Sequence, residues 1–277
     1  MHTSSSPDTW LLREAQNLAV SLAEQAGEIQ LAAVRAGYEI HHKGTVDLVT
    51  DADIASEKLI SAGIRAAYPG HRLIGEEGAE GHVESDYGWL IDPIDGTTNF
   101  AHGFPHWAVS ICLEHRGRPV MGVVFDVAKN EMFTAIIGQG AYLNGDRIEV
   151  SAIDTLMQAM GATGFAYDIS ARTPAFQLWE AFNNNAQAMR RAGAAALDMV
   201  WVACGRLDFY LEQPINNWDV SAGAIICLEA GGTVTAYNGD PYDINDTQIC
   251  ASNTLLHDQM LRLIRETSHV HATTLPE

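Results

Sequence analysis

The sequence predicts an α+β protein built in layers. Long segments with helical periodicity occur toward both ends of the chain, and short apolar segments separated by turn residues occupy its middle. The two kinds of segment do not alternate in a regular βαβ order, which argues against a doubly wound parallel sheet. We therefore expect sheets that are covered by helices.

The first half of the chain is expected to begin with two helices. Apolar residues recur at helical spacing over residues 8–37, with Asp8 as the cap. A second helix is expected over residues 51–68, where Pro69-Gly70 closes it. A short strand or hairpin lies between the two helices, and a short strand after them leads into a loop rich in glycine and acids. From residue 89 the pattern predicts an antiparallel meander with turns at residues 116–117, 129–130 and 144–145.

The second half is predicted to mix strands and helices. Asp219 is expected to cap a helix that Gly231-Gly232 ends. The remaining expected elements are strands at 160–168, 205–213 and 233–237, helices at 173–189, 194–204 and 255–267, and a frayed tail from residue 267.

Composition indicates a cytoplasmic protein that does not bind nucleic acid. The formal net charge is −19, from 35 acidic residues against 16 Lys plus Arg, and the sequence has no basic stripe. Four cysteines lie far apart in apolar surroundings without metal-ligand spacing, which favours reduced thiols and a reducing compartment. We identify neither a signal peptide nor an apolar run long enough to cross a membrane.

Acidic residues gather where the expected elements end. They stand in "VDLVTDAD", "GEEG", "WLIDPIDGTTNF" and "NNWDVSAG". Asp92 and Asp95, three residues apart after an apolar strand, would repel each other unless a cation or open water separates them. Carboxylates without histidine or thiolate suit a hard cation such as Mg²⁺, and Gly96 lets the backbone approach an anion closely. Taken singly, each motif is also typical of a turn, a helix cap or a surface loop with solvated acids.

Together these motifs resemble the inositol monophosphatase family. The resemblance covers nearly the whole chain and includes "GQGAYLNG" and "RRAGAAALDMVWVACGRLDFYLE". It implies a layered αβαβα sandwich of the sugar-phosphatase type, with two sheets interleaved with helix pairs. It also implies one catalytic unit over residues 1–277, with an N-terminal α+β part to about residue 150 and a C-terminal α/β part over residues 151–277.

The resemblance further implies roles for individual residues. Glu76, Asp92 and the carbonyl of Ile94 would bind one Mg²⁺, and Asp92, Asp95 and Asp219 a second, with a third ion sometimes held near Glu76. Thr97, paired with Asp53, and Glu76 would position the metal-activated water that attacks phosphorus directly. The expected substrate-binding residues are Asp95, Gly96, Thr97, Gly193, Ala195 and Glu212, and Lys43 is a weaker match to a basic residue near the metals.

The expected activity is hydrolysis of inositol monophosphate or a related polyol or sugar phosphate. Thr98 and Asn99 in "DGTTNF" argue against the histidinol-phosphatase and nucleotide-sulfate phosphatase branches, whereas Ala166 and "QPINNWD" depart from the family pattern at the substrate pocket. Fructose 1,6-bisphosphate, NADP and histidinol phosphate remain alternative substrates. A regulatory binding protein of the transcription or translation machinery is the alternative from another class. The family further implies lithium sensitivity and a homodimer.

Overall fold

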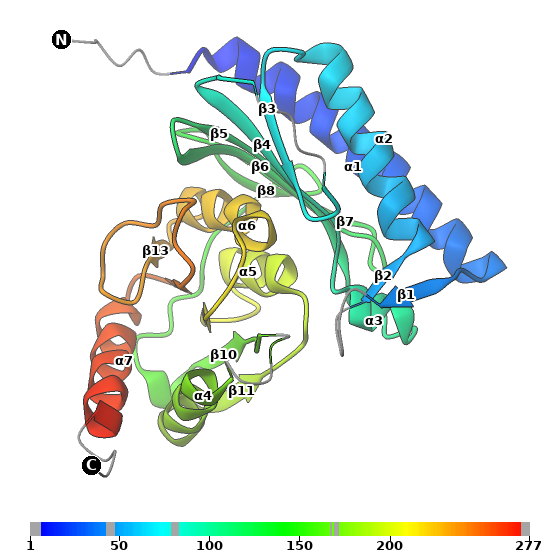
Figure 1. Cartoon of the computed structure of the whole chain (residues 1–277). Helices are drawn as coiled ribbons and strands as arrows, with labels where there is room; N and C mark the ends of the chain where they lie inside the picture. Colours follow the sequence, from blue (N-terminus) through cyan, green and yellow to red (C-terminus); the bar gives the residue numbers. More distant parts are fainter. Residues whose placement is uncertain (1–6, 43–47, 79–82, 167, 169–171, 273–277) are drawn as a thin grey trace.

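The computed structural model describes residues 7–42, 48–78, 83–166, 168 and 172–272. Its helices and strands form five layers, as the family resemblance predicted. Figure 1 shows α1 (Thr9–Ala36) and α2 (Asp51–Ala67) on one face of a large sheet, with α5 (Ala195–Ala203) and α6 (Asn217–Glu229) on the other. A smaller sheet follows, and α4 (Thr173–Asn185) and α7 (His257–Ala272) cover its far side.

The large sheet has seven strands in the order β3-β4-β5-β6-β7-β8-β9. Its strands are β3 (Arg72–Gly75), β4 (Tyr87–Asp95), β5 (Ala108–His115), β6 (Arg118–Asp126), β7 (Glu131–Ile136), β8 (Gly140–Leu143) and β9 (Asp146–Ile148). All neighbours from β4 to β9 pair antiparallel, so the predicted meander is confirmed, while β3 adds in parallel to β4. The predicted turns place Arg116, Asn130 and Asn144 at positive φ, a conformation that asparagine in particular tolerates at hairpin ends.

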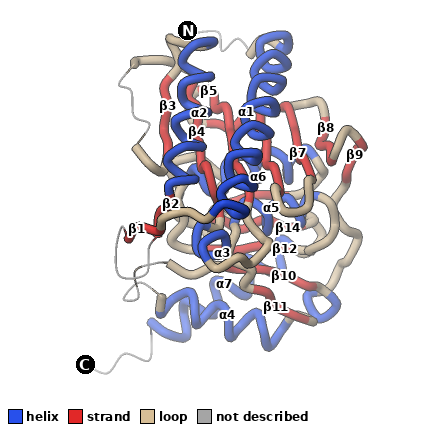
Figure 2. Tube along the Cα trace, turned by 90° about the vertical axis from the view of Figure 1, so that its right-hand side faces the viewer, coloured by secondary structure: helices blue, strands red, loops and turns tan. Residues whose placement is uncertain are grey.

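The smaller sheet has five strands in the order β11-β10-β12-β14-β13. Its strands are β10 (Met160–Thr163), β11 (Ala188–Arg190), β12 (Phe209–Glu212), β13 (Thr233–Thr235) and β14 (Ile249–Ser252). Figure 2 shows β10, β11, β12 and β14 below the large sheet, and Figure 1 shows the smaller sheet on the side away from α1 and α2. A separate two-stranded hairpin joins β1 (Ile40–His42) to β2 (Leu48–Thr50), as the sequence predicted. A single turn of 3₁₀ helix, Leu156–Gln158, precedes β10.

Helix α6 belongs to the packing of both sheets. Its buried residues include Val220, Ala222 and Ile226, and it contacts β6 on one side and β13 on the other. The largest apolar cluster accordingly joins Phe133 of the large sheet to Tyr210 of the smaller one. Such a helix must be apolar on all sides, which explains why its sequence lacks a polar face.

The structure corrects three details of the predicted helices. The helix expected over residues 173–189 ends at Asn185, because Ala188–Arg190 pair in parallel with β10 as an edge strand. Asp219 is not the N-cap of α6, since Asn216 holds that position and donates its backbone N–H to Asp219 Oδ2 at 3.2 Å. The chain stays helical to Ala272, beyond the start of the expected frayed tail.

The strands expected over 160–168, 205–213 and 233–237 are present but shorter, and three other predicted features agree with the structure. Asp8 caps α1 by accepting the Trp10 N–H at 2.9 Å. All four cysteines are free, and three are buried while Cys204 is partly buried. Among the described helices, none has an apolar stretch long enough to cross a bilayer.

Candidate functional site

A bulge in strand β4 explains how two aspartates three residues apart reach one pocket. In a regular strand, residues i and i+3 point to opposite faces of the sheet. The β4–β5 register shifts between Asp92, which pairs with Ser110, and Asp95, which pairs with Ala108. One extra residue on β4 re-aims the side chain that follows it, and Pro93 lies within this bulge, where no ladder hydrogen bond is required of it.

The bulge is fixed by a buried glutamine on α1. Gln30 is fully buried, and its Nε2 donates to the carbonyl oxygen of Pro93 at 2.9 Å. Its Oε1 accepts the indole N–H of Trp107 at 3.1 Å. These bonds satisfy the polar atoms of the bulge inside an apolar layer and so hold the two aspartates in place.

The acids predicted to bind metal line one pocket between the two sheets. Four carboxyl side chains come from the turn after β3, from β4 and from the first turn of α6. The pocket is lined by Glu76, Asp92, Ile94, Asp95, Gly96, Thr97, Thr163, Gly164, Phe165, Arg191, Gly193, Ala194, Ala195, Asp198, Glu212, Ile215, Asn216 and Asp219. It therefore brings together every predicted site residue except Asp53, which lies behind Thr97, and Lys43, which is outside the described residues.

Burial and mutual repulsion make these carboxyl groups hard to ionise. Burial raises the pKa of Asp92 well above its usual range, and the charges of Glu76, Asp95 and Asp219 raise it further. Burial likewise raises the pKa of Asp219 and brings that of Asp95 to about 7. Among the described lining residues, Arg191 is the one cationic side chain. The described lining thus has more acidic groups than its one cationic side chain can neutralise, so no protein cation relieves the repulsion between Asp92 and Asp95.

The donor set of the pocket fits a hard divalent cation. The side chains that would face the ion supply carboxylate oxygens, and the Ile94 carbonyl adds a backbone oxygen. Mg²⁺ prefers oxygen donors, and its charge would offset the cost of burying several carboxylates together. A second group consists of Glu39 just before β1, His41 on β1 and Asp51 at the start of α2, and it has one ligand atom from each residue within 4.8 Å of the others. These side chains are exposed and need no cation, so we assign no site to them.

Asp95 also joins the large sheet to helix α5. Its Oδ1 and Oδ2 accept the backbone N–H groups of Ala195 and Ala196 at 3.1 and 2.7 Å. A carboxylate at a helix N-terminus satisfies free amides and interacts well with the helix dipole. Asp95 therefore positions the segment that lines the pocket opposite β4, in addition to facing the acids.

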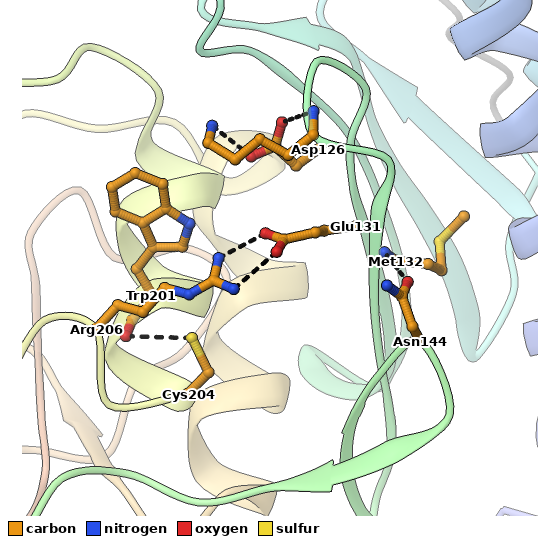
Figure 3. Close-up of polar contacts among 8 residues, drawn as sticks. Asp126, Glu131, Met132, Asn144, Trp201, Cys204 and Arg206 are labelled. Carbon is orange, nitrogen blue, oxygen red and sulfur yellow. Dashed lines mark hydrogen bonds and ion pairs between the residues drawn. The ribbon is translucent and has the colours of Figure 1, made fainter.

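The other end of α5 is tied to the same sheet by charged residues (Figure 3). Arg206 donates two hydrogen bonds to the carboxylate of Glu131 on β7, at 2.5 and 2.7 Å. Lys129 lies 5.1 Å from the ring centre of Trp201 and donates to Asp126 at 2.9 Å. Asp95 at the start of α5 and the Arg206–Glu131 pair after its end therefore both fix the helix to the sheet that carries Asp92 and Asp95.

Thr97 and Asp53 are paired, as the resemblance predicted. The Thr97 hydroxyl lies 3.1 Å from Asp53 Oδ1 and 3.0 Å from the Ile94 carbonyl oxygen. Asp53 is fully buried at the start of α2, and it also accepts hydrogen bonds from the backbone N–H and hydroxyl of Thr50. Burial raises the pKa of Asp53 to about 6, although these hydrogen bonds oppose the shift. Asp53 is therefore a buried carboxyl group behind the pocket, within hydrogen-bond distance of the Thr97 hydroxyl that lines it.

Gly96 forms the turn between β4 and the short helix α3 (Thr97–Ala101). Its φ of 95° is in the left-handed region, where glycine is favoured. A side chain at Gly96 would also lie about 3.1 Å from the carbonyl oxygen of His106 and 3.2 Å from that of Gly193. Asn99 fixes this packing, because its Nδ2 lies 2.8 to 3.2 Å from the carbonyl oxygens of His106, Ala192 and Gly193. The "DGTTNF" motif thus holds the Gly193 segment against the turn.

Glu212, at the end of β12, lines the pocket from the smaller sheet. Its Oε2 accepts the hydroxyl of buried Tyr210 at 2.5 Å, and burial raises the pKa of Glu212 to about 7. A Cβ at Gly164 would come within 2.0 Å of Glu212 Oε2, so this glycine makes room for the carboxylate. The parallel pairing of β10 with β12 ends at Thr163↔Leu211, one residue before Gly164 and Glu212.

Sequence reasoning missed two charged residues of the pocket, Arg191 and Asp198. Arg191 precedes the Gly193 segment, and Asp198 lies in the first turn of α5, where it is 2% exposed. Burial raises the pKa of Asp198 well above its usual range. An acid inside the apolar run "AAALDMVWVA" was the available signal, because a charged residue is rarely buried without a reason.

Comparison with known proteins gives consistent matches over most of the chain. Residues 11–269 match the model of the inositol monophosphatase family. Inositol monophosphatase 2 of Solanum lycopersicum is 39% identical over 263 residues, which cover 92% of this chain and 99% of that protein. Nus factor SuhB of Pseudomonas aeruginosa is 40% identical over 257 residues, covering 90% and 95%. The solved structure of inositol monophosphatase from Anabaena has a TM-score of 0.83 and 37% identity, covering 92% of this chain and 96% of that one.

Proposed function

The chain belongs to the inositol monophosphatase family, a family of phosphatases, and we propose that it is a Mg²⁺-dependent phosphomonoesterase acting on inositol monophosphate or a related polyol phosphate. The observation that carries the proposal is the pocket in which Glu76, Asp92, Asp95 and Asp219 meet beside the Gly96 turn. A site with this much buried negative charge would repel a phosphate ester, so it requires cations before an anionic substrate enters.

In this proposal the carboxylates of the pocket bind two Mg²⁺ ions, and a third near Glu76. Glu76, Asp92 and the Ile94 carbonyl would hold one Mg²⁺, and Asp92, Asp95 and Asp219 would hold a second, with a third near Glu76. When bound, the ions lower the pKa of a water molecule and offset the charge that develops on the phosphoryl group. The main-chain N–H groups of Gly96 and Thr97 would donate to phosphate oxygens.

Thr97 and Asp53 would orient the attacking water. The Thr97 hydroxyl has one proton and two acceptors, Asp53 Oδ1 at 3.1 Å and the Ile94 carbonyl at 3.0 Å. Donation to Asp53 leaves the lone pairs of Thr97 Oγ1 free to accept a hydrogen bond from a water molecule in the pocket. Glu76, which also lines the pocket, would accept a second hydrogen bond from the same water and so fix its direction toward phosphorus.

The substrate's polyol portion would lie against the other half of the chain. Glu212 would bind a ring hydroxyl, and Gly193 to Ala195 would line the ring. We therefore propose that residues 1–277 act as one catalytic unit, because Asp95 in the N-terminal part and Asp219 in the C-terminal part serve the same pocket. From the family resemblance we also propose a homodimer and inhibition by Li⁺, and from the four free cysteines a reducing, cytoplasmic location.

Phosphate release from inositol 1-phosphate, with Mg²⁺ and with a chelator, tests the activity. Fructose 1,6-bisphosphate, NADP and histidinol phosphate assayed beside it would rank the alternative substrates by kcat/KM. We expect release that depends on Mg²⁺ and is fastest with the polyol ester. Absence of release from every one of these esters would refute the proposed function.

A regulatory binding role is the second candidate, because relatives at 40 and 38% identity are named Nus factor SuhB. An Asp95→Asn variant separates the two roles, since it changes a proposed metal ligand inside the pocket and leaves the outer surface alone. Co-purification of the transcription machinery with both the variant and the wild type would favour the binding role. The absence of such partners would argue against the binding role and leave the phosphatase function as the remaining candidate.

A further inference from the structure

Asp198 is a buried acid whose carboxyl group has no assigned role. It lies in the first turn of α5, is 2% exposed, and lines the same pocket as the metal-binding acids. Among the described residues, its Oδ1 has no hydrogen-bond partner. A buried carboxyl oxygen without a partner is costly to a fold, so a position of this kind indicates a group that meets its partner in another state of the protein.

The fold itself does not need the Asp198 side chain. Acids in the first turn of a helix usually accept the free backbone N–H groups there. In α5 that task belongs to Asp95, which accepts from Ala195 and Ala196, while the N–H of Asp198 donates to the Ala194 carbonyl oxygen at 3.0 Å. The carboxyl group of Asp198 is therefore left over after the helix end has been satisfied.

The position of Asp198 places it beside the polyol end of the pocket. Residues i and i+3 of a helix share one face, so Asp198 follows Ala195 along the face of α5 that lines the cavity. Glu212 and Arg191 are the charged groups of the cavity that act on it from β12 and from the segment before α5, and Asp95 acts on it from β4. Glu212 already accepts the Tyr210 hydroxyl, whereas Asp198 keeps its hydrogen-bonding capacity for a ligand.

We propose that the Asp198 side chain binds a hydroxyl group of the substrate's polyol portion, next to the hydroxyl bound by Glu212, and thereby selects polyol phosphates over simple phosphate esters. This inference rests on the proposed phosphatase function. A pocket built to hydrogen-bond a hydroxyl discriminates strongly against a substrate that lacks it, because its own polar atoms then stay unpaired. Glu212 on β12 and Asp198 on α5 would then each bind a different hydroxyl group of the same ring.

The test compares two esters and three variants. Asp198→Ala removes the carboxyl group, Asp198→Asn keeps a hydrogen-bonding oxygen in nearly the same volume, and Ser61→Ala removes another buried polar atom without a partner, far from the pocket lining. The value of kcat/KM is measured for inositol 1-phosphate and for phenyl phosphate, which has no hydroxyl on its ring. Thermal unfolding of each variant is recorded in parallel.

We expect Asp198→Ala to lower the preference for inositol 1-phosphate over phenyl phosphate by about tenfold or more, and Asp198→Asn to restore most of it. The unfolding temperature of Asp198→Ala should match that of wild type as closely as Ser61→Ala does, since no internal bond is lost. Equal losses on the two esters would overturn the inference, as would a clear drop in unfolding temperature for Asp198→Ala. Absence of hydrolysis of either ester by the wild type would instead refute the proposed phosphatase function.

Discussion

Replacing Thr97 by valine tests the proposed water-orienting pair with almost no change in shape. Valine has the volume of threonine but no hydroxyl, so the 3.1 Å contact with Asp53 is lost while the packing around the 5% exposed side chain is kept. Asp53 keeps its two hydrogen bonds from Thr50, and its own position at the start of α2 should not change.

The size of the expected losses in stability and in rate follows from general magnitudes for a lost hydrogen bond and for acid–base catalysis. A hydrogen bond to a charged group contributes about 1.5–3 kcal/mol to stability, out of about 5–15 kcal/mol for a typical domain. More than about nine-tenths of the variant should therefore stay folded at 25 °C. Loss of a positioned proton acceptor costs about 10²–10⁴ in rate, so the fall in kcat should far exceed any loss of folded protein.

The assay is phosphate release from inositol 1-phosphate at saturating Mg²⁺, combined with urea unfolding of the same samples. Thr97→Ser keeps the hydroxyl and should retain most of the activity, and Thr98→Val, one residue away and outside the pocket lining, is the matched control. A kcat for Thr97→Val within about threefold of wild type would refute the reasoning. A Thr97→Ser variant as inactive as Thr97→Val would contradict it too, because the hydroxyl would then not be the group that matters.

Three further predictions concern the same pocket. Gly164→Ala should lower kcat/KM for inositol 1-phosphate by about tenfold or more, because its Cβ would meet Glu212 Oε2 at 2.0 Å; unchanged kinetics would show that Glu212 does not contact the substrate. Asn99→Ala should lower the free energy of unfolding by about 2 kcal/mol in urea titrations, because the amide contacts three carbonyl oxygens; a loss below about 0.5 kcal/mol would contradict this. The metal-free protein should be more stable near about pH 5 than near about pH 8. Folding raises the pKa of Asp53 to about 6 and those of Asp95 and Glu212 to about 7, so these groups favour the folded state while protonated and lose that contribution as the pH rises through these values. Urea midpoints in a chelator should follow this order, and Mg²⁺ should raise the midpoint most at the higher pH; a metal-free midpoint that rises with pH would oppose the assignment.

Much of the fold was predictable because its signals are local. The meander was read from its turn residues, and α1 from its helical periodicity and the Asp8 cap, each of which depends on a few neighbouring side chains. Strand β11 was missed because it has three residues and its pairing with β10 is set by a partner 28 positions away in sequence, at Met160↔Ala188. A short edge strand of this kind leaves no periodicity to read, and residues 188–189 were assigned to the preceding helix instead.

The site was predictable where its residues belong to compact motifs. The acids of "DPIDGTT" and the Thr97–Asp53 pair were found, but the β4 bulge that aims Asp92 and Asp95 into one pocket was not, because a register shift depends on the partner strand. The N-terminal position of α6 was misjudged by three residues, since Asn216 and Asp219 are both good cap residues. Asp198 was missed although an acid inside an apolar run was the available signal, and Arg191 was missed because nothing local distinguishes a pocket arginine from a surface one.

The central claim is that the buried carboxylates of this pocket bind Mg²⁺, and titration calorimetry tests it most directly. The wild-type protein, Asp92→Asn and Asp126→Asn would be titrated with Mg²⁺ under the same conditions, Asp126 being a buried acid outside the pocket that pairs with Lys129. We predict Mg²⁺ binding by the wild type and by Asp126→Asn, and a loss of most of that binding in Asp92→Asn. Equal binding by all three proteins, or none by the wild type, would contradict the claim.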